Sequence, residues 1–284
     1  MGYFHTVLMC RIYFILATPY ICSSQTYNQT KSIHEDKINA LTYNKEIRPL
    51  DDQSQQLNVS LSLQLFAMEH VDDVSQQMTV DVQFTFKWKD QRLSWDSSQY
   101  GGETVIFPDV QTIWRPRIGV DTEKADLFQS SQEPVRVDHQ GSVTWAAVAV
   151  FTVACSLDMS KFPFDEHTCA FSIYSLAMPL TQLRLTSPQS IFHTDYFTDN
   201  GEWELLGSSM NFVPNEYVAF GYKVSTSNVF VTIKRRPTFL LLNTLLPVML
   251  LTFLNMMTLL IPVESGEKVS YGITVLLALS TILT

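Results

Sequence analysis

The residues best suited to chemistry are two cysteines, Cys155 and Cys169, with thirteen residues between them. A disulfide between them would close a loop of about 15 residues, worth roughly 3 kcal/mol of stability from loop entropy. Cys10 and Cys22 lie in the apolar start of the chain, so Cys155 and Cys169 are the only pair expected in the mature protein. One pair suits an oxidising, extracellular setting and does not suit zinc, which takes three or four protein ligands.

The loop between these cysteines combines aromatic rings with charge. It contains Phe162, Pro163, Phe164 and Asp165 in succession. Because proline lowers the cost of a cis peptide bond, the Phe162–Pro163 bond suits a tight, fixed turn. We therefore expect a rigid knuckle with apolar residues at its tip. The alternative interpretation is a simple disulfide staple in a secreted β-domain.

Composition and spacing argue against several classes of function. The formal net charge is −9 and the pI is near 5.1, which disfavours nucleic acid as a partner and favours cations. The histidines have neither metal-ligand nor triad spacing, and we attribute them to solvated loops. They are His5, His34, His70, His139, His167 and His193. Since nucleophile elbow and P-loop patterns are also absent, we expect no enzyme activity, no metal and no cofactor.

The start of the chain has the features of a secretory signal. Residues 1–24 contain an apolar run at 12–17 that is followed by small residues, as in a cleaved signal peptide. Arg11 interrupts the apolar stretch, so a signal anchor is the alternative. Glycosylation sequons begin at Asn28 and Asn58, and they fit an extracellular domain.

Hydrophobic periodicity predicts the architecture of the next 200 or so residues. A modest apolar stripe predicts a short helix over about residues 31–45. The period then changes to two, which is typical of half-buried strands. These strands are expected at residues 59–65, 78–88, 143–153, 170–174 and 229–233. The sequence therefore predicts a mainly β fold, with an immunoglobulin-like β-sandwich over about residues 31–236.

The composition changes abruptly after a basic cluster at residues 234–236. Residues 239–261 carry no charged side chain and are numerous enough to span a bilayer as a helix. Pro247 is tolerated there if neighbouring helices satisfy the freed backbone. A buried helix of a soluble protein is the alternative. A second apolar segment, residues 269–284, completes an expected but incomplete bundle of transmembrane α-helices.

The second apolar segment carries hydroxyl groups along one stripe. Ser270, Thr274, Leu277 and Thr281 recur at helical spacing. A polar stripe in a membrane helix faces other helices or water. Both helix packing through small polar residues and a water-filled pathway explain the pattern.

Several motifs resemble one known family. The pattern Cys-x-x-Asp-x-x-x-Phe-Pro-Phe-Asp-x-x-x-Cys at 155–169 resembles the signature of the Cys-loop receptors, the pentameric ligand-gated ion channels. Residues 88–95, 113–118 and 200–203 are similar to further motifs of the family, and 265–277 resemble the pore helix of nicotinic acetylcholine receptor subunits. With the signal at 1–24, the resemblance implies an extracellular ligand-binding domain at 25–236 and the start of a channel domain at 237–284.

The resemblance implies a coupling region between these two domains. The turn at Asp73 and Val74 resembles the loop that the family places above the membrane, and Arg235 matches the basic residue before the first span. We expect an ion pair between Asp73 and Arg235, with the Phe162–Phe164 tip beside it, and we assign Asp165 to the same coupling region. The alternative is that the basic cluster only meets lipid headgroups.

The ligand site departs from the family's pattern. In the family, a cage of aromatic rings binds the agonist's ammonium group through cation–π contacts, and a vicinal cysteine pair, missing here, marks the α subunits. The matching positions hold Gln83, Asp121, Ser175 with Leu176, and Val224, while Tyr217, Phe220 and Tyr222 could supply rings. We therefore expect an accessory subunit or a different ligand. Asp121 either attracts a cation or lies in an ordinary exposed loop.

The resemblance also implies cation selectivity. Glu264 and Glu267 precede the pore helix, and rings of carboxylates select cations. Leu277 would form an apolar gate, with the hydroxyls of Ser270 and Thr274 facing the ions. Glu267 also fits the simpler role of an acid at a helix N-terminus.

The implied protein is a subunit of a neurotransmitter-gated channel in a postsynaptic or other plasma membrane. Its partners would be homologous subunits in a pentameric ring, a small neurotransmitter that could be acetylcholine-like, the lipid bilayer and permeant cations. The family's third and fourth membrane helices are not in the sequence. The alternative is therefore a non-conducting truncated subunit or a ligand-binding decoy.

Overall fold

The computed structural model describes residues 27–39, 43–121, 128, 133–176, 178–187, 192–198, 200–213, 218–219, 221–257 and 268–283. The predicted signal segment lies outside these residues, as do Tyr217, Phe220, Glu264 and Glu267.

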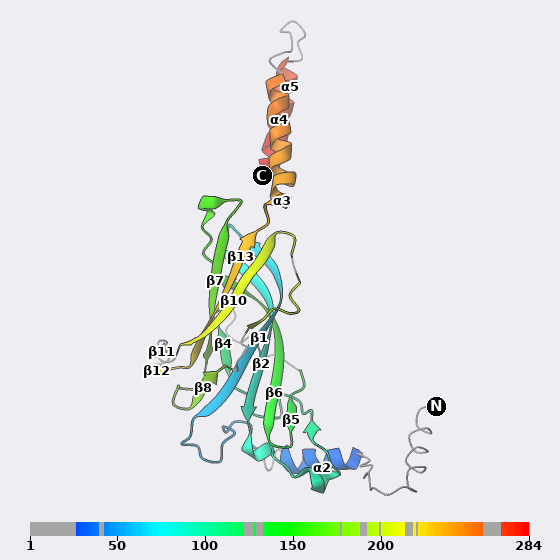
Figure 1. The fold of residues 1–284 in the computed structure, drawn as a ribbon, viewed down its shortest axis with the longest axis vertical. Helices are drawn as coiled ribbons and strands as arrows, with labels where there is room; N and C mark the ends of the chain where they lie inside the picture. The colour runs from blue at the N-terminus through cyan, green and yellow to red at the C-terminus, as the bar shows by residue number, and fades with distance from the viewer. Residues whose placement is uncertain are drawn as a thin grey trace, which may run out of the picture.

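Two β-sheets form the body of the molecule (Figure 1). Their strands are β1 (Leu57–Asp72), β2 (Gln77–Lys89), β3 (Val105–Ile106), β4 (Ile118–Val120), β5 (Arg136–Asp138), β6 (Ser142–Ala154), β7 (Glu166–Ser175), β8 (Leu183–Thr186), β9 (Phe192–His193), β10 (Trp203–Val213) and β13 (Thr226–Arg235). The first sheet has the order β3-β5-β6-β2-β1-β8 with β9 beside β1, and the second has the order β10-β13-β7-β4. A separate ribbon pairs β11 (Val218–Ala219) with β12 (Tyr222–Lys223).

The sandwich core follows from the alternation in the sequence. In β2, every second side chain from Met78 to Trp88 is buried, and the residues between them are partly or fully exposed. Phe151 of β6 and Phe171 of β7 meet edge to face across the two sheets, with ring centroids 5.4 Å apart. The predicted β-sandwich is therefore confirmed.

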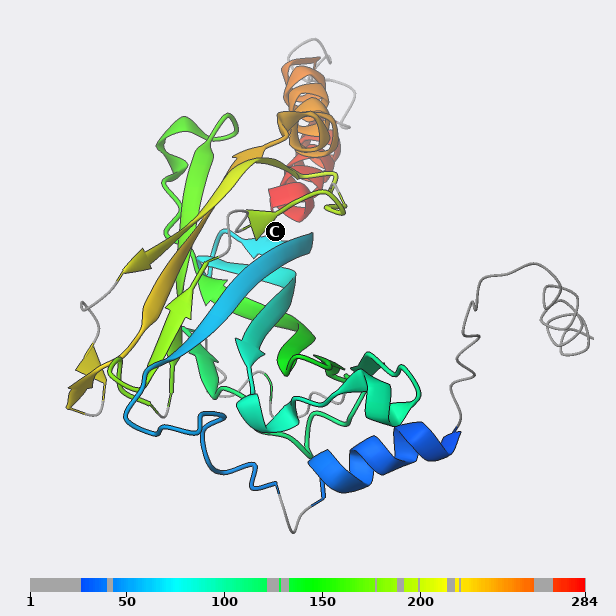
Figure 2. The ribbon, with the colours of Figure 1, turned by 60° about the horizontal axis from the view of Figure 1, so that its bottom comes forward.

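The first described helix, α2 (Tyr27–Lys37), begins and ends earlier than predicted. It lies across the end of the sandwich opposite the C-terminal helices (Figures 1 and 2). Ile33 is fully buried, and Asp36 accepts a hydrogen bond from Tyr100. The prediction of a helix reaching residue 45 was wrong. The side chain of Tyr43 is instead buried in the sandwich core, and its hydroxyl group donates a hydrogen bond to Asp90.

The C-terminal part is helical. The first run comprises α3 (Pro237–Leu240), the π-helical turn η5 (Leu241–Leu245) and α4 (Leu246–Met257), and α5 (Lys268–Leu283) packs beside α4. Val275 is buried there, and the Tyr271 hydroxyl donates to the carbonyl of Leu254 at 3.4 Å. Within the described residues, none of the helices has both the length and the apolar character needed to cross a membrane. The spans at 239–261 and 269–284 stay predictions.

Candidate functional site

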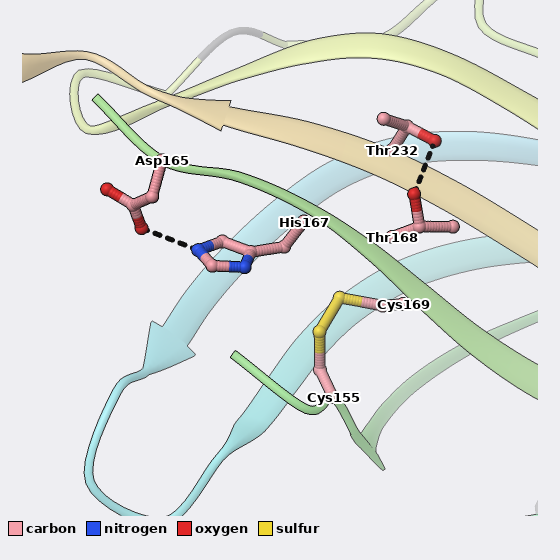
Figure 3. The surroundings of a disulfide bond; sticks show 6 residues. All are labelled: Cys155, Asp165, His167, Thr168, Cys169 and Thr232. Carbon is pink, nitrogen blue, oxygen red and sulfur yellow. Dashed lines mark hydrogen bonds and ion pairs between the residues drawn. A yellow bond between two sulfur atoms is a disulfide. The ribbon is translucent and has the colours of Figure 1, made fainter. Parts of the chain in front are cut away.

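The disulfide joins the residue after β6 to β7, where Cys169 pairs with Val231 of β13 (Figure 3). Cys155 and Cys169 are bonded and buried, with their Cα atoms 4.8 Å apart. The amide of Cys155 also donates to the carbonyl of Gln76 at 2.8 Å. The predicted disulfide is therefore confirmed. The hydrogen bond to Gln76 holds the start of the loop closed by this disulfide against the turn between β1 and β2.

The cysteine loop presents an apolar tip. Asp158 caps a short 3-10 helix, η4 (Met159–Lys161), by accepting a hydrogen bond from the amide of Ser160. The Phe162–Pro163 bond that follows is cis. Phe162 is 45% exposed and Phe164 62% exposed. Apolar side chains therefore stand at the tip, as the sequence predicted.

Arg235, the last residue of β13, joins two loops that are distant in sequence. Its Nη2 lies 2.8 Å from Oδ1 of Asp73, in the turn between β1 and β2. Its Nε lies 3.0 and 3.2 Å from the two carboxylate oxygens of Asp165. Asp165 is the residue before β7 and belongs to the cysteine loop, residues 155–169. Side-chain exposure is 10% for Arg235, 1% for Asp165 and 31% for Asp73. The predicted Asp73–Arg235 pair is present, and Asp165 is the more deeply buried partner.

Two aromatic rings flank the guanidinium group of Arg235. Its Cζ lies 4.2 Å from the ring centroid of Trp203 and 5.1 Å from that of Phe162. Trp203 is buried and stands opposite Arg235 in the pairing of β10 with β13. A guanidinium group over an aromatic face gains cation–π energy, more so where it is desolvated. Phe162 of the cysteine loop and Trp203 of β10 thus both contact the guanidinium group of Arg235.

The histidine next to this pair is not solvated, contrary to our expectation. The side chain of His167 is only 2% exposed, and its Nε2 lies 2.5 Å from Oδ2 of Asp165 (Figure 3). Burial raises the pKa of Asp165, but hydrogen bonds from Arg235 and His167 outweigh burial and hold this pKa below its usual value. The bonded carboxylates also raise the pKa of Arg235, although burial alone would lower it.

A second ion pair lies on the outer side of the same strands. Nζ of Lys234 is 2.8 Å from Oε1 of Glu166, and both side chains are exposed. This hydrogen bond lowers the pKa of Glu166 and raises that of Lys234. Exposed pairs of this kind contribute little to stability. The two basic residues therefore sit in different environments, since Arg235 is engaged inside the protein.

Most of the described residues predicted for the ligand site lie near one end of the second sheet. Asp121 is exposed just after β4, and β4 pairs with the end of β7. Ser175 is buried, and its hydroxyl group donates to the carbonyl of Met178 at 3.1 Å. Leu176 is half-buried and donates its amide to the carbonyl of Arg117. Tyr222, also half-buried, belongs to β12.

Gln83 lies in the other sheet, on β2. It lines an open groove of about 520 Å³ between β1, β2 and β9. The residues of this groove are mostly polar: Ser62, Leu63, Gln64, Phe66, Gln83, Thr85, His193 and Tyr196. The structure therefore divides the described residues among the predicted ligand positions between two surfaces of the sandwich.

The predicted pore stripe lies on α5. Ser270, Thr274 and Thr281 are exposed, and Leu277 is 62% exposed. The hydroxyl group of Thr274 donates to the carbonyl of Ser270, which satisfies this hydroxyl group within the helix.

The structure describes the asparagine of both glycosylation sequons. Asn28 lies in α2, and Asn58 is exposed on β1.

The sequence reasoning missed the role of His167, although a usable signal was present. Side chains two apart on a strand share a face. Since Cys169 and Phe171 point inward, His167, two residues before Cys169, shares their buried face. Trp203 was noted only as part of a motif, and its contact with Arg235 depends on the pairing of β10 with β13.

Comparison with known proteins agrees with this architecture. The family described as "Neurotransmitter-gated ion-channel ligand binding domain" matches residues 30–237. The chain is 30% identical to acetylcholine receptor subunit delta of Rattus norvegicus, with 95% of this chain and 55% of the relative covered. It is 29% identical to neuronal acetylcholine receptor subunit beta-4 of Homo sapiens, with coverage of 95% and 54%. It is 32% identical to neuronal acetylcholine receptor subunit beta-2 of Carassius auratus, with coverage of 85% and 52%.

The chain spans about half the length of these relatives. The family match covers the whole sandwich, including the cysteine loop and the Arg235 cluster, which comprises Asp73, Asp165, His167 and Arg235. The chain therefore belongs to the neurotransmitter-gated ion-channel ligand-binding domain family and is a nicotinic-like member of the Cys-loop receptors.

Proposed function

We propose that the chain is a subunit of a cation-selective, neurotransmitter-gated pentameric channel. A signal peptide would occupy residues 1–24, the extracellular domain residues 25–236 and the start of the channel domain residues 237–284. The observation that carries this proposal is the position of Arg235. It is the last residue of the sandwich before the helices, and it holds two separate loops.

The Arg235 cluster would pass binding energy from the sandwich to the helices. Only Arg236 stands between Arg235 and the first residue of α3, Pro237. A displacement of the cysteine loop would move Asp165, and a displacement of the turn between β1 and β2 would move Asp73. Both movements would act on the same guanidinium group, whose side chain is 10% exposed. This arrangement suits a role in coupling.

The ligand is proposed to differ from that of the acetylcholine-binding relatives, or the subunit to be an accessory one. The predicted ligand positions hold Asp121, Ser175, Leu176 and Gln83, which cannot form an aromatic cage. Rings would come from Tyr217, Phe220 and Tyr222. The groove beside Gln83 offers amides, hydroxyls and an imidazole, which favour a hydrogen-bonding ligand. Strong acetylcholine-gated current from homomers would refute this assignment.

Cation selectivity is assigned to Glu264 and Glu267, which precede α5 in the sequence. In a ring of homologous subunits, repeated carboxylates would select cations, with Leu277 as an apolar gate. Recordings from the full-length chain with its partner subunits test this directly. Glu267→Ala should weaken the preference for cations over anions. A reversal potential that follows chloride in the unmutated channel would show that the assignment is wrong.

A double-mutant cycle tests the coupling role. In the co-assembled full-length receptor, Asp73→Arg and Arg235→Asp should each impair gating, and the charge-swapped double variant should recover part of the loss. The matched control is the same cycle on Glu166 and Lys234, an exposed ion pair whose members are the sequence neighbours of Asp165 and Arg235. We expect little effect there because exposed pairs contribute little. Zero coupling energy between Asp73 and Arg235 would refute the role.

The same recordings address the alternative, a non-conducting subunit or decoy. Surface expression with retained ligand binding, but no current in any subunit combination, would favour that alternative over the channel.

A further inference from the structure

Two cationic side chains stand beside the groove on the outer face of the first sheet. Thr85 lines the groove, and Lys87 is the next residue of β2 on the same face, about 7 Å further along the strand. Lys87 pairs with Thr144 of β6, which in turn pairs with Arg136 of β5. Lys87 and Arg136 therefore belong to one row across the sheet, with their backbones about 10 Å apart because one strand lies between them.

Neither cation is neutralised by another of the residues that the structure describes. Both side chains are exposed, and no ion pair joins either of them to a described carboxylate. Asp138 shares their face of the sheet, but its Oδ1 accepts hydrogen bonds from the amides of Gln140 and Ser142 in the turn after β5. The positive charge of the row is therefore open to a ligand.

The next row of the same face extends the positive charge. Lys89 follows Lys87 on β2, and Arg184 of β8 pairs with Asn58 of β1. Both of these further cations are exposed. The chain as a whole has a formal net charge of −9, so this cluster is opposite in sign to the molecule that carries it. A surface of one sign raises the local concentration of small ions of the other sign, and this one favours anions.

The groove itself is lined by neutral hydrogen-bonding groups. Its lining side chains include no aspartate, glutamate, lysine or arginine, and the amides of Gln64 and Gln83 offer both donors and acceptors. Asp195 lies 3.8 Å from His193 at the β9 side, but it is 79% exposed and screened by water. A volume of about 520 Å³ is that of a small-molecule site.

We propose that the ligand of this groove is a small molecule with a carboxylate group. Lys87 and Arg136 bind the carboxylate, and the amides of Gln64 and Gln83 hold the rest of the molecule by hydrogen bonds. A guanidinium group can contact both carboxylate oxygens, and an ammonium group adds a point charge. This inference names the class of ligand for the groove, so it rests on the ligand-binding role proposed above. A quaternary ammonium ligand would be repelled here.

The first test measures binding to the full chain in detergent, without reference to current. The probes are L-glutamate and, as its ammonium counterpart, choline, both followed by saturation-transfer NMR at constant ionic strength. We expect saturation transfer to glutamate and no displacement of glutamate by choline. Absence of transfer to glutamate, or its displacement by choline, would overturn the proposal.

Substitutions then locate the carboxylate. Lys87→Gln and Arg136→Gln should each weaken glutamate binding about tenfold, as expected for the loss of one hydrogen bond to a charged group. Both side chains are exposed, so the variants should fold, and an unchanged Tm verifies it. Unchanged glutamate binding in both variants would contradict the assignment.

Two further variants separate the site from the net charge. Gln83→Leu should also weaken glutamate binding, and unchanged binding would place the probe outside the groove and refute the proposal. The matched control is Lys31→Gln on α2, which removes a lysine that is 54% exposed. This control should bind glutamate as the unmutated chain does. If it reproduces the loss, net charge rather than the row beside the groove is responsible, and the proposal is wrong.

Recordings from the co-assembled full-length receptor distinguish this inference from the proposed function. Glutamate binding that depends on Lys87 and Arg136, without current in any subunit combination, would uphold the ligand class and count against the channel. Acetylcholine-gated current that is unaltered in Lys87→Gln and Arg136→Gln, with no glutamate binding, would refute the ligand class and leave the channel standing.

Discussion

Two buried arginine–aspartate clusters stand at opposite ends of the sandwich and are built differently. At the helix end, Arg235 joins Asp73 and Asp165, which are 162 and 70 residues away in sequence. At the α2 end, Arg92 binds Asp90, only two residues away. The ion pairs of the first cluster connect distant segments, whereas the ion pair of the second lies within a single turn.

The carboxylate of the α2-end cluster is completely enclosed, while the side chain of Arg92 is 22% exposed. Asp90 is fully buried and receives three hydrogen bonds of 3.0 Å from Arg92, two from the guanidinium group and one from the amide, and one of 2.6 Å from the hydroxyl group of Tyr43. Burial, and then the charge of Asp90, raises the pKa of Tyr43 far above its usual value. The amide of Trp114 also donates to this hydroxyl group. Arg92 also donates to the carbonyl of Asn44, so the cluster ties the segment after α2 to the sandwich.

The helix-end cluster keeps more freedom. Asp73 is 31% exposed, and the adjacent Val74 is 95% exposed. A partly hydrated ion pair can be broken and remade at modest cost, whereas a fully buried one cannot. The comparison indicates that the enclosed cluster serves stability, and that the partly open one is able to rearrange.

The largest expected effect comes from breaking the enclosed cluster. Asp90→Ala should lower the free energy of unfolding by about 3–5 kcal/mol because it leaves Arg92 without its buried partner. Chemical denaturation measures the loss, and Asp195→Ala, whose side chain is 79% exposed, is the control. A loss comparable to that of the control would mean that the two ends do not differ in this way.

Arg235→Ala should have a somewhat smaller effect. It strands Asp165, yet His167 remains bonded to that carboxylate, so we expect a loss near the low end, about 3 kcal/mol. Arg235→Lys should recover only part of it, since an ammonium group lacks the planar fork that reaches both carboxylates. Full recovery by lysine would show that charge alone matters.

Acid should weaken the helix-end cluster through Asp165. Because the pKa of Asp165 is lower in the folded protein than in the unfolded chain, its stabilisation is complete above about pH 4 and is lost as the pH falls further. Unfolding free energies of the unmutated chain and of Asp165→Asn should therefore converge below about pH 4. If the difference between the two unfolding free energies stays constant across that pH range, Asp165 is not the group that destabilises the cluster in acid.

The smallest effect on stability should come from Asp73→Ala. Its carboxylate is partly exposed, so we expect about 0–1 kcal/mol. If the helix-end cluster serves coupling, the same substitution should impair gating more than Asp90→Ala does in those receptors that fold. A large loss of stability with normal gating would reverse our comparison of the two clusters.

The sequence predicted the parts of the fold that depend on local pattern. The strands were found because buried and exposed side chains alternate, as they do from Met78 to Trp88. The end of α2 was misplaced because the anchor that redirects the chain, Asp90, lies far along the sequence from Tyr43. His167 was assigned to a solvated loop because a single histidine carries no periodicity of its own.

The sequence by itself determined the cysteine pair, the alternating strands and the family, since each depends on residue identity and spacing along the chain. The tertiary structure alone decided the environment of each charge. Lys234 and Arg235 are neighbours in sequence, but alternation on β13 places one in water and the other against Trp203 and Asp165. Strand pairing sets which side chains share a buried face, and that pairing depends on contacts between segments that the chain brings together only when it folds.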